Sequence, residues 1–228
     1  MGRPVLLVLA GVNGAGKSSI GGNIMLRRAG MAWFNPDTWT RILAQGGMTL
    51  SEANARAWQH GVDLLDQAIA AGRSHAFETT LGGATMARKI VAASRTHDVL
   101  MWFCGLSSPE QHIARVAARV AAGGHDIPEA RIRERWVQSP LNLIELMPHL
   151  STLHMFDNSA DAAPGEPVPD PVRVLQVRSG AVDFPLALTD LERTPDWAKP
   201  IVKAARDHAH TPSAGLPEVD FRSRARSS

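Results

Sequence analysis

The amino-acid sequence predicts an α/β fold, in which a mostly parallel β-sheet lies between two layers of helices (αβα). Short apolar runs alternate with longer helical patterns through the first 158 of 228 residues. A glycine-rich loop follows the first apolar run, at the point where a strand would turn into a helix. In such a sheet, ligands bind beyond the carboxyl ends of the strands, so those ends are where functional residues are expected.

We expect five strands, at residues 4–10, 31–34, 74–79, 98–106 and 152–156. Between them we expect helices at residues 17–29, 36–45, 51–71, 83–96, 109–122 and 128–147. Ser51 and Ser108 are acceptors suited to helix starts. Pro140 is expected to break the last of these helices, because proline lacks the N–H of the helical ladder.

The remaining chain has three parts. Residues 161–171 hold four prolines and one glycine, which is typical of a linker. Residues 172–177 and 181–184 flank Ser179-Gly180 and predict a β-hairpin, followed by a helix over 196–210. We expect 172–210 to pack on a core formed by residues 1–160. Residues 211–228 are polar and rich in arginine, and are expected to be a disordered tail.

Composition excludes several classes of protein. The formal net charge is only +2, so no nucleic-acid partner is expected. A single cysteine, Cys104, excludes an internal disulfide and lies in an apolar run, which indicates a buried thiol in a reducing compartment. The chain shows no signal sequence at its start and no run of 18 apolar residues, so we expect a cytoplasmic protein without a membrane span.

The loop Gly11-Val12-Asn13-Gly14-Ala15-Gly16-Lys17-Ser18 fits a glycine, four residues of any kind, then Gly-Lys-Ser. Such a loop points backbone N–H groups at a phosphate, and the following helix adds its positive dipole end. Lys17 would reach the β- and γ-phosphates, and the Ser18 hydroxyl would bind Mg²⁺. The alternative is a glycine-rich turn without function, which is rare in this pattern. The candidate nucleotide-binding residues are Gly11, Asn13, Gly14, Ala15, Gly16, Lys17, Ser18 and Ser19.

Two carboxylates lie at the ends of predicted strands. Asp37 comes after Asn35-Pro36 at a helix start, where it could cap the helix or accept the proton of a substrate hydroxyl. The sequence leaves these two roles balanced. Glu78 lies at the end of a strand that is otherwise buried, where a carboxylate is costly without a cation, a metal or a ligand hydroxyl. A solvated strand end is the alternative, and contact with substrate or with Mg²⁺-bound water is the preferred interpretation.

Arginines surround the break Gly123-Gly124-His125-Asp126-Ile127-Pro128. Arg115 and Arg119 are four residues apart, so they share a helix face before the break. After it, Arg131, Arg133 and Arg135 follow. We expect a lid near residues 115–135 that neutralises phosphate charge, although an exposed charged helix face is the alternative for any single arginine. The fourth strand lacks a terminal aspartate for Mg²⁺, which disfavours a motor or transport ATPase and suits a small kinase.

Together these motifs resemble the zeta toxin family of P-loop kinases, in particular its branch of zeta-toxin-like predicted ATPases or kinases. The resemblance covers about residues 3–160 and rests on residues 10–19, 34–37, 77–81, 115–120, 123–128, 142–143 and 157–159. Glu134, Trp136 and Gln138 depart from it, because relatives often have arginine or tyrosine there.

The resemblance implies ATP-dependent phosphorylation of a small-molecule hydroxyl, with ATP and Mg²⁺ as cofactors. UDP-N-acetylglucosamine is the family's best-known acceptor, phosphorylated on the 3′-hydroxyl of its sugar. By matching positions, Lys17 and Ser18 would bind phosphates and Mg²⁺, and Asp37 would be the base. The substrate-binding candidates are Asp37, Glu78, Thr79 and Arg115, and the catalytic lid arginines would be Arg119 and Arg135.

The resemblance also implies an antitoxin protein as a possible partner, although nothing in this chain resembles an antitoxin. Two other functions remain open: a regulatory ATPase without a phosphoryl acceptor, and a kinase acting on nucleic-acid ends. Asp37 and Glu78 argue against the first, since a switch needs no base at a strand end. The near-neutral charge argues against the second, which only the arginine-rich tail favours.

Overall fold

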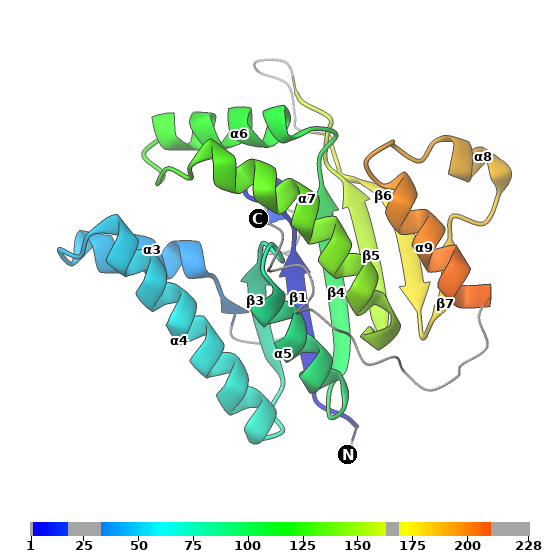
Figure 1. The fold of residues 1–228 in the computed structure, drawn as a ribbon, viewed down its shortest axis with the longest axis horizontal. Helices are drawn as coiled ribbons and strands as arrows, with labels where there is room; N and C mark the ends of the chain where they lie inside the picture. Colours follow the sequence, from blue (N-terminus) through cyan, green and yellow to red (C-terminus); the bar gives the residue numbers. More distant parts are fainter. Residues whose placement is uncertain (1, 18–32, 163–168, 211–228) are drawn as a thin grey trace, which may run out of the picture.

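The computed structural model describes residues 2–17, 33–162 and 169–210, and its central element is a seven-stranded sheet (Figure 1). The strands are β1 (Val5–Ala10), β2 (Trp33–Phe34), β3 (His75–Thr79), β4 (Asp98–Gly105), β5 (Thr152–Asp157), β6 (Val172–Arg178) and β7 (Ala181–Phe184). Their order is β2-β3-β1-β4-β5-β6-β7. The first five in this order pair in parallel, and β6 and β7 continue the sheet antiparallel. The expected mostly parallel α/β sheet is therefore confirmed.

The register of the parallel strands places their carboxyl ends side by side. Ala10 at the end of β1 is opposite Thr79 of β3 and Phe103 of β4, and Gly105 of β4 is opposite Asp157 of β5. The backbone N–H of Gly11 then donates to the carbonyl of Thr79 at 3.2 Å. The glycine-rich loop thus begins at the shared carboxyl edge of the sheet, where a ligand site is expected.

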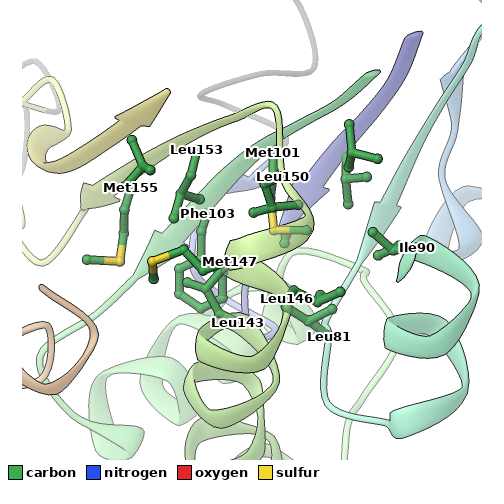
Figure 2. Packing of buried hydrophobic residues seen from close by; sticks show 14 of the residues in the cluster. Leu81, Ile90, Met101, Phe103, Leu143, Leu146, Met147, Leu150, Leu153 and Met155 are labelled. Atoms are coloured by element: carbon green, nitrogen blue, oxygen red, sulfur yellow. The ribbon is translucent and has the colours of Figure 1, made fainter. Parts of the chain in front are cut away.

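Three helices cover one face of the sheet: α5 (Ala84–Ser94), α7 (Glu129–Leu146) and α9 (Lys199–His210) (Figure 1). The C-terminal turns of α7 and the short 3-10 helix η1 (Met147–His149) pack against side chains of β4 and β5 (Figure 2). The buried residues at this contact include Leu143, Leu146, Met147, Met101, Phe103, Leu153 and Met155. Burial of these apolar side chains is the main force that holds α7 on the sheet.

Two further helices, α3 (Pro36–Gln45) and α4 (Leu50–Ala70), pack against each other beside β2 and β3. Helix α6 (Pro109–Ala121) crosses above the carboxyl ends of the strands (Figure 1). The sequence did not indicate the short helix α8 (Leu188–Glu192). The helix expected over residues 17–29 lies outside the described residues apart from Lys17, as do residues 31 and 32 of the expected second strand.

The expected break of α7 at Pro140 is wrong, because the helix continues through this residue. Contacts on both sides of the proline hold it. The Ser139 hydroxyl donates to the carbonyl of Thr80 at 2.5 Å, and the Asn142 amide donates to the carbonyl of Leu81 at 2.7 Å. These bonds and the buried apolar face outweigh the one backbone hydrogen bond that proline removes.

Two expected helix caps also differ. Helix α4 starts one residue earlier than expected, with Thr49 as its N-cap in a capping box with Glu52, so Ser51 lies inside the helix. The N-cap of α3 is Asn35, whose side chain accepts from the N–H of Thr38. Ser108 does cap α6, accepting from the N–H of Gln111 at 3.2 Å.

The C-terminal hairpin belongs to the main sheet, because β6 pairs with β5 from Thr152↔Arg178 to Asp157↔Val172. Ser179 and Gly180 form its turn, both with positive φ, which is typical of a two-residue hairpin loop. Helix α9 begins at Lys199 and packs on β6, β7 and α7. Among the described residues, no helix is long and apolar enough to cross a membrane. Residues 163–168 of the expected linker and the tail 211–228 lie outside the described residues.

Candidate nucleotide and acceptor site

The glycine-rich loop is shaped by glycines that no other residue could replace. Gly11, Gly14 and Gly16 have φ angles of 139°, 82° and 79°, which disfavour any side chain. A Cβ on Gly11 would collide with the carbonyl of Cys104, and one on Gly16 with the side-chain amide of Asn158. The backbone therefore lies tightly against β4 and the segment after β5. Because these positions carry no side chains, none stands between the loop backbone and a ligand.

Side chains from three distant segments hold the loop. His112 Nδ1 lies 2.8 Å from the Asn13 carbonyl, so this nitrogen carries the proton and donates to that oxygen. The Asn158 amide donates to the carbonyl of Ala15 at 3.0 Å, and Arg135 donates to Asn13 Oδ1 at 2.6 Å. Burial lowers the pKa of His112 to about 4, so the ring is neutral near pH 7. Sequence reasoning missed His112, because a histidine on the inner face of a helix carries no signal of its own.

Lys17 and Glu78 form a buried ion pair. Their Nζ and Oε1 atoms are 3.3 Å apart, and both side chains are almost inaccessible to water. Lys17 also donates to the carbonyl of Val12 at 3.3 Å, and Glu78 Oε2 accepts from the Asn35 amide at 2.9 Å. Glu78 is thus a buried strand-end carboxylate, and the alternative of a solvated strand end is wrong. A buried charge of this kind is stabilised only by such partners.

Asp37 is the second residue of α3, and its carboxylate does not cap the helix because Asn35 does. Instead, Asp37 Oδ2 lies 3.3 Å from a guanidinium nitrogen of Arg119. Its Oδ1 lies 3.7 Å from His125 Nε2. The cap role that the sequence left open is therefore excluded in this structure. The carboxylate of Asp37 connects α3 to the arginine-bearing segment, and sequence reasoning did not anticipate the contact with His125.

The arginines divide into two groups by what they contact. Arg119 and Arg135 reach the site, through Asp37 and Asn13 respectively, and burial lowers the pKa of Arg135. Arg115 instead pairs with Asp161 at 2.6 Å, on the segment after β5. The other two are exposed on α7: Arg131 pairs with Glu134 of the same helix, and Arg133 pairs with Glu110 of α6. Of the five, Arg119 contacts Asp37, Arg135 contacts Asn13 of the loop, and Arg131 lines the same cavity as both Asp37 and Asn13.

A cavity of about 800 Å³ opens beside the loop. It is lined by residues of the loop, the ends of β2 and β3, helices α3 and α4, and the starts of α5 and α7. Its polar wall includes Asn13, Asp37, Thr40, Asn54, Glu78, Thr79, Thr80 and Arg135, and its aromatic wall includes Phe34, Trp58 and Phe77. Apolar walls with a few convergent polar groups are typical of small-molecule sites. Arg131 and Arg135 line this cavity, whereas Arg115 and Arg119 do not.

Within the described residues, no group of three or more histidine, cysteine, aspartate or glutamate side chains could hold a metal ion. The two serines expected to bind phosphate and Mg²⁺, Ser18 and Ser19, lie outside the described residues. The thiol of Cys104 is buried, as expected, and burial raises its pKa to about 12.

A parallel sheet ordered β2-β3-β1-β4-β5, with a glycine-rich loop and a buried lysine after β1, defines a P-loop domain with a kinase-like fold. The comparison with protein families agrees. Residues 6–136 match the family described as "AAA domain", and the chain belongs to this family. No curated protein matches the chain.

Solved structures show the same fold at low sequence identity. A structure of the AvrRxo1-ORF1:-ORF2 complex has a TM-score of 0.61 and 18% identity, over 92% of this chain and 72% of that chain. The same complex with ATP has a TM-score of 0.58 and 16% identity, over 91% and 81%. A structure of the PezAT chromosomal toxin-antitoxin system of Streptococcus pneumoniae has a TM-score of 0.55 and 12% identity, over 92% of this chain and 89% of that chain. The zeta-toxin-like P-loop fold expected from the sequence is therefore confirmed.

Proposed function

We propose that this protein is an ATP-dependent kinase that transfers the γ-phosphate to a hydroxyl of a small molecule held in the 800 Å³ cavity. One observation carries the proposal: the Asp37 carboxylate and Asn13 of the glycine-rich loop line the same cavity. A hydroxyl compound in that cavity would have a proton acceptor beside it and a phosphate loop within reach. This is the arrangement that phosphoryl transfer by positioning requires.

The loop fits the phosphates of ATP. Its glycines leave no space for side chains, so the backbone can approach the phosphates closely. Arg119 Nε is buried and has no hydrogen-bond partner within the described residues, which suits a group that awaits an anion. The similar AvrRxo1 complex solved with ATP supports the same ligand here. Lys17, Ser18 and Ser19 would contact the phosphates, and Ser18 would hold Mg²⁺, which neutralises phosphate charge in such reactions.

In the proposed reaction, the acceptor hydroxyl gives its proton to a carboxylate oxygen of Asp37. The hydroxyl oxygen then forms a bond to the γ-phosphorus while the bond between that phosphorus and ADP breaks. Arg119 pairs with Asp37 before ATP binds, so its movement to the phosphates would free the carboxylate to accept the proton. Arg135, held at Asn13, would add a second positive charge beside the transferring group.

Lys17 must also change partners. Before ATP binds, its ammonium pairs with Glu78. When it contacts the β- and γ-phosphates, Glu78 would remain beside Asn35 and face the cavity. Its carboxylate could then accept a hydrogen bond from an acceptor hydroxyl, with Thr79 as a neighbouring contact. Glu78 and Thr79 are in this way proposed to hold the substrate.

The acceptor is proposed to be a hydroxylated ring compound, with UDP-N-acetylglucosamine as the first candidate. Flat sugar or base faces pack well on aromatic side chains such as Phe34, Trp58 and Phe77. Hydroxyl, amide and carboxylate groups on the other walls can pair with the hydroxyls of such a molecule. The volume of the cavity lies in the range of sites for ligands of this size.

The test measures ADP formation from ATP and Mg²⁺, alone and with UDP-N-acetylglucosamine or a library of hydroxylated metabolites. We expect one acceptor to raise turnover and to gain one phosphate by mass spectrometry. Lys17→Ala should abolish this product, and Arg133→Ala, on an exposed arginine outside the cavity, should not. ADP formation that no acceptor changes would indicate a regulatory ATPase instead. Phosphate transfer only to a 5′-hydroxyl oligonucleotide would indicate a polynucleotide-end kinase.

We also propose a protein partner that acts as an antitoxin. The support is that the similar AvrRxo1-ORF1 and PezAT proteins are described in a complex and in a toxin-antitoxin system. Expression of the wild-type chain alone should then arrest growth of a bacterial host, and expression of Lys17→Ala should not. Normal growth with active wild-type enzyme in the cell would contradict a toxic role.

A further inference from the structure

We propose that Trp197 is a positioning residue for the nucleotide site, which it acts on through Asp157. Trp197 lies just before α9, outside residues 6–136 that match the family model. The segment that it fixes supports the glycine-rich loop. The part of the inference that concerns ATP rests on the function proposed above, whereas the part that concerns the loop itself does not.

The first step is the contact between Trp197 and the ends of two strands. Its indole Nε1–H donates to Asp157 Oδ1, the last residue of β5, at 3.1 Å. The face of the indole covers Gly105, the last residue of β4, where a Cβ would collide with the ring. Its ring centroid lies 6.5 Å from that of Phe103. The indole thus contacts the carboxyl ends of both β4 and β5, which lie beside each other in the sheet, and holds them together.

The second step leads from Asp157 to the glycine-rich loop. The hydroxyl of Ser159 donates to the same oxygen of Asp157 at 2.5 Å. Between these residues, the N–H of Asn158 donates to the carbonyl of Gly105 at 3.0 Å. The buried Asn158 side chain then donates to the carbonyl of Ala15 at 3.0 Å. The position of Asp157 therefore sets where Asn158 places the glycine-rich loop.

The indole N–H of Trp197 contributes a strong hydrogen bond to the segment after β5. A hydrogen bond to a carboxylate is stronger than one between neutral groups, because the acceptor is charged. Without the indole, Asp157 would keep its bond from Ser159, and Gln111 would still donate to the Ser159 carbonyl at 2.6 Å. The segment after β5 would therefore loosen without unfolding. The loop would be less ordered before ATP binds, so the entropy cost of ordering it on binding would weaken ATP affinity.

The test compares wild type with Trp197→Phe, which keeps an aromatic ring before α9 but removes the N–H donor to Asp157 and the outer indole atoms over Gly105. The matched control is Trp102→Phe, a half-buried tryptophan on the other face of β4. The first measurement is the Kd of a nonhydrolysable ATP analogue. We expect Trp197→Phe to raise this Kd by about 5- to 20-fold. We expect KM for ATP to rise similarly and kcat to change by less than about twofold. Trp197→His, which restores a ring N–H, should recover part of the affinity.

The second measurement is hydrogen exchange of the loop peptide, residues 11–17, without any nucleotide. We expect faster exchange in Trp197→Phe than in wild type or Trp102→Phe, at matched temperature below unfolding. Equal Kd values for Trp197→Phe and wild type, or equal loop exchange, would overturn the positioning role. If wild type itself does not bind the analogue, the proposed function fails, and the exchange comparison still decides whether Trp197 fixes the loop.

Discussion

Lys17 carries two roles at the residue scale, in phosphate binding and in the buried pair with Glu78. Lys17→Ala should abolish phosphoryl transfer and greatly weaken ATP binding, because the loop sequence Gly11–Ser18 contains no other cation. It should also lower the free energy of unfolding by roughly 3–5 kcal/mol, because Glu78 stays buried without its lysine. The double variant Lys17→Ala/Glu78→Gln should recover stability in urea unfolding and remain inactive. Turnover near the wild-type rate in Lys17→Ala would overturn the assignment of the loop.

Asp37 can be tested without disturbing its helix, because Asn35 is the cap of α3. Asp37→Asn should leave ATP affinity nearly unchanged and reduce transfer by roughly two to four orders of magnitude, the usual effect of losing a general base. Single-turnover measurements of transfer and calorimetry of ATP binding provide the two numbers. A near-normal rate would leave Asp37 only its contact with Arg119.

His112 makes stability depend on pH. Its pKa falls from 6.5 to about 4 in the folded protein, chiefly because of burial. Between pH 6.5 and 4, the unfolded chain binds a proton at His112 that the folded protein does not bind. Stability is therefore retained above pH 6.5 and lost as pH falls toward 4. The full effect is about 3 kcal/mol. His112→Asn can keep the donor to Asn13 and should flatten urea-unfolding stability over this pH window. An unchanged slope would show that His112 is not the group responsible.

At this scale, the sequence predicts the residues of the loop, because the chemistry of phosphate binding fixes their spacing. It also identifies Asp37 and Glu78 from their places at the ends of strands. It does not predict which residues they contact. The pairs Lys17–Glu78 and Asp37–Arg119 join residues 61 and 82 positions apart, and only the packed fold brings such residues together.

At the scale of elements, α6 and α7 carry the arginines of the expected lid. Their response to bound ligands therefore tests whether they move as a lid. Hydrogen exchange should slow across about residues 115–135 when a nonhydrolysable ATP analogue and an acceptor are both bound, because added phosphate charge attracts the arginines. Arg119→Ala should lower the transfer rate by about 100-fold and ATP affinity much less, since charge shifts in the transition state. Arg133→Ala, which removes only an exposed pair with Glu110, is the control. Ligand-independent exchange together with a silent Arg119→Ala would exclude a lid.

Element boundaries follow from local sequence where local signals dominate. Helix α3 runs over Pro36–Gln45 as expected, and Ser108 caps α6 as expected. The continuity of α7 could not be predicted from local sequence. Ser139 bonds to Thr80, 59 residues away, and Asn142 bonds to Leu81, 61 residues away. Such tertiary bonds outweigh the local preference of Pro140 to end a helix.

On the scale of the whole molecule, the C-terminal segment completes the hydrophobic core. Leu175 and Val177 of β6 and Ile201 and Val202 of α9 belong to the same buried cluster as the central strands. A fragment ending at residue 160 should therefore lose cooperative urea unfolding, because it exposes this cluster and the edge of β5. A chain ending at His210 is the control and should unfold as the full chain does. A cooperative 1–160 fragment would show that the core is independent of the hairpin.

The overall topology was predictable because the alternation of strands and helices restricts a chain to few arrangements. The hairpin itself was also predictable from Ser179-Gly180. Its pairing with β5 was not, since nothing local to residues 172–184 specifies which edge it joins. That pairing extends one sheet from the nucleotide loop to the C-terminal half of the chain.

The unbroken course of α7 has a mechanical consequence. At 1.5 Å per residue, its 18 residues form a rod of about 27 Å. Arg135, in the second turn of α7, contacts the phosphate loop, and Leu146, its last residue, lies in the buried core. Because the helix continues through Pro140, Arg135 and the core-facing C-terminal turns belong to one element. If an arriving phosphate displaces Arg135 together with its helix turn, we expect the C-terminal end of α7 to shift as well, and that end is where the movement can be detected.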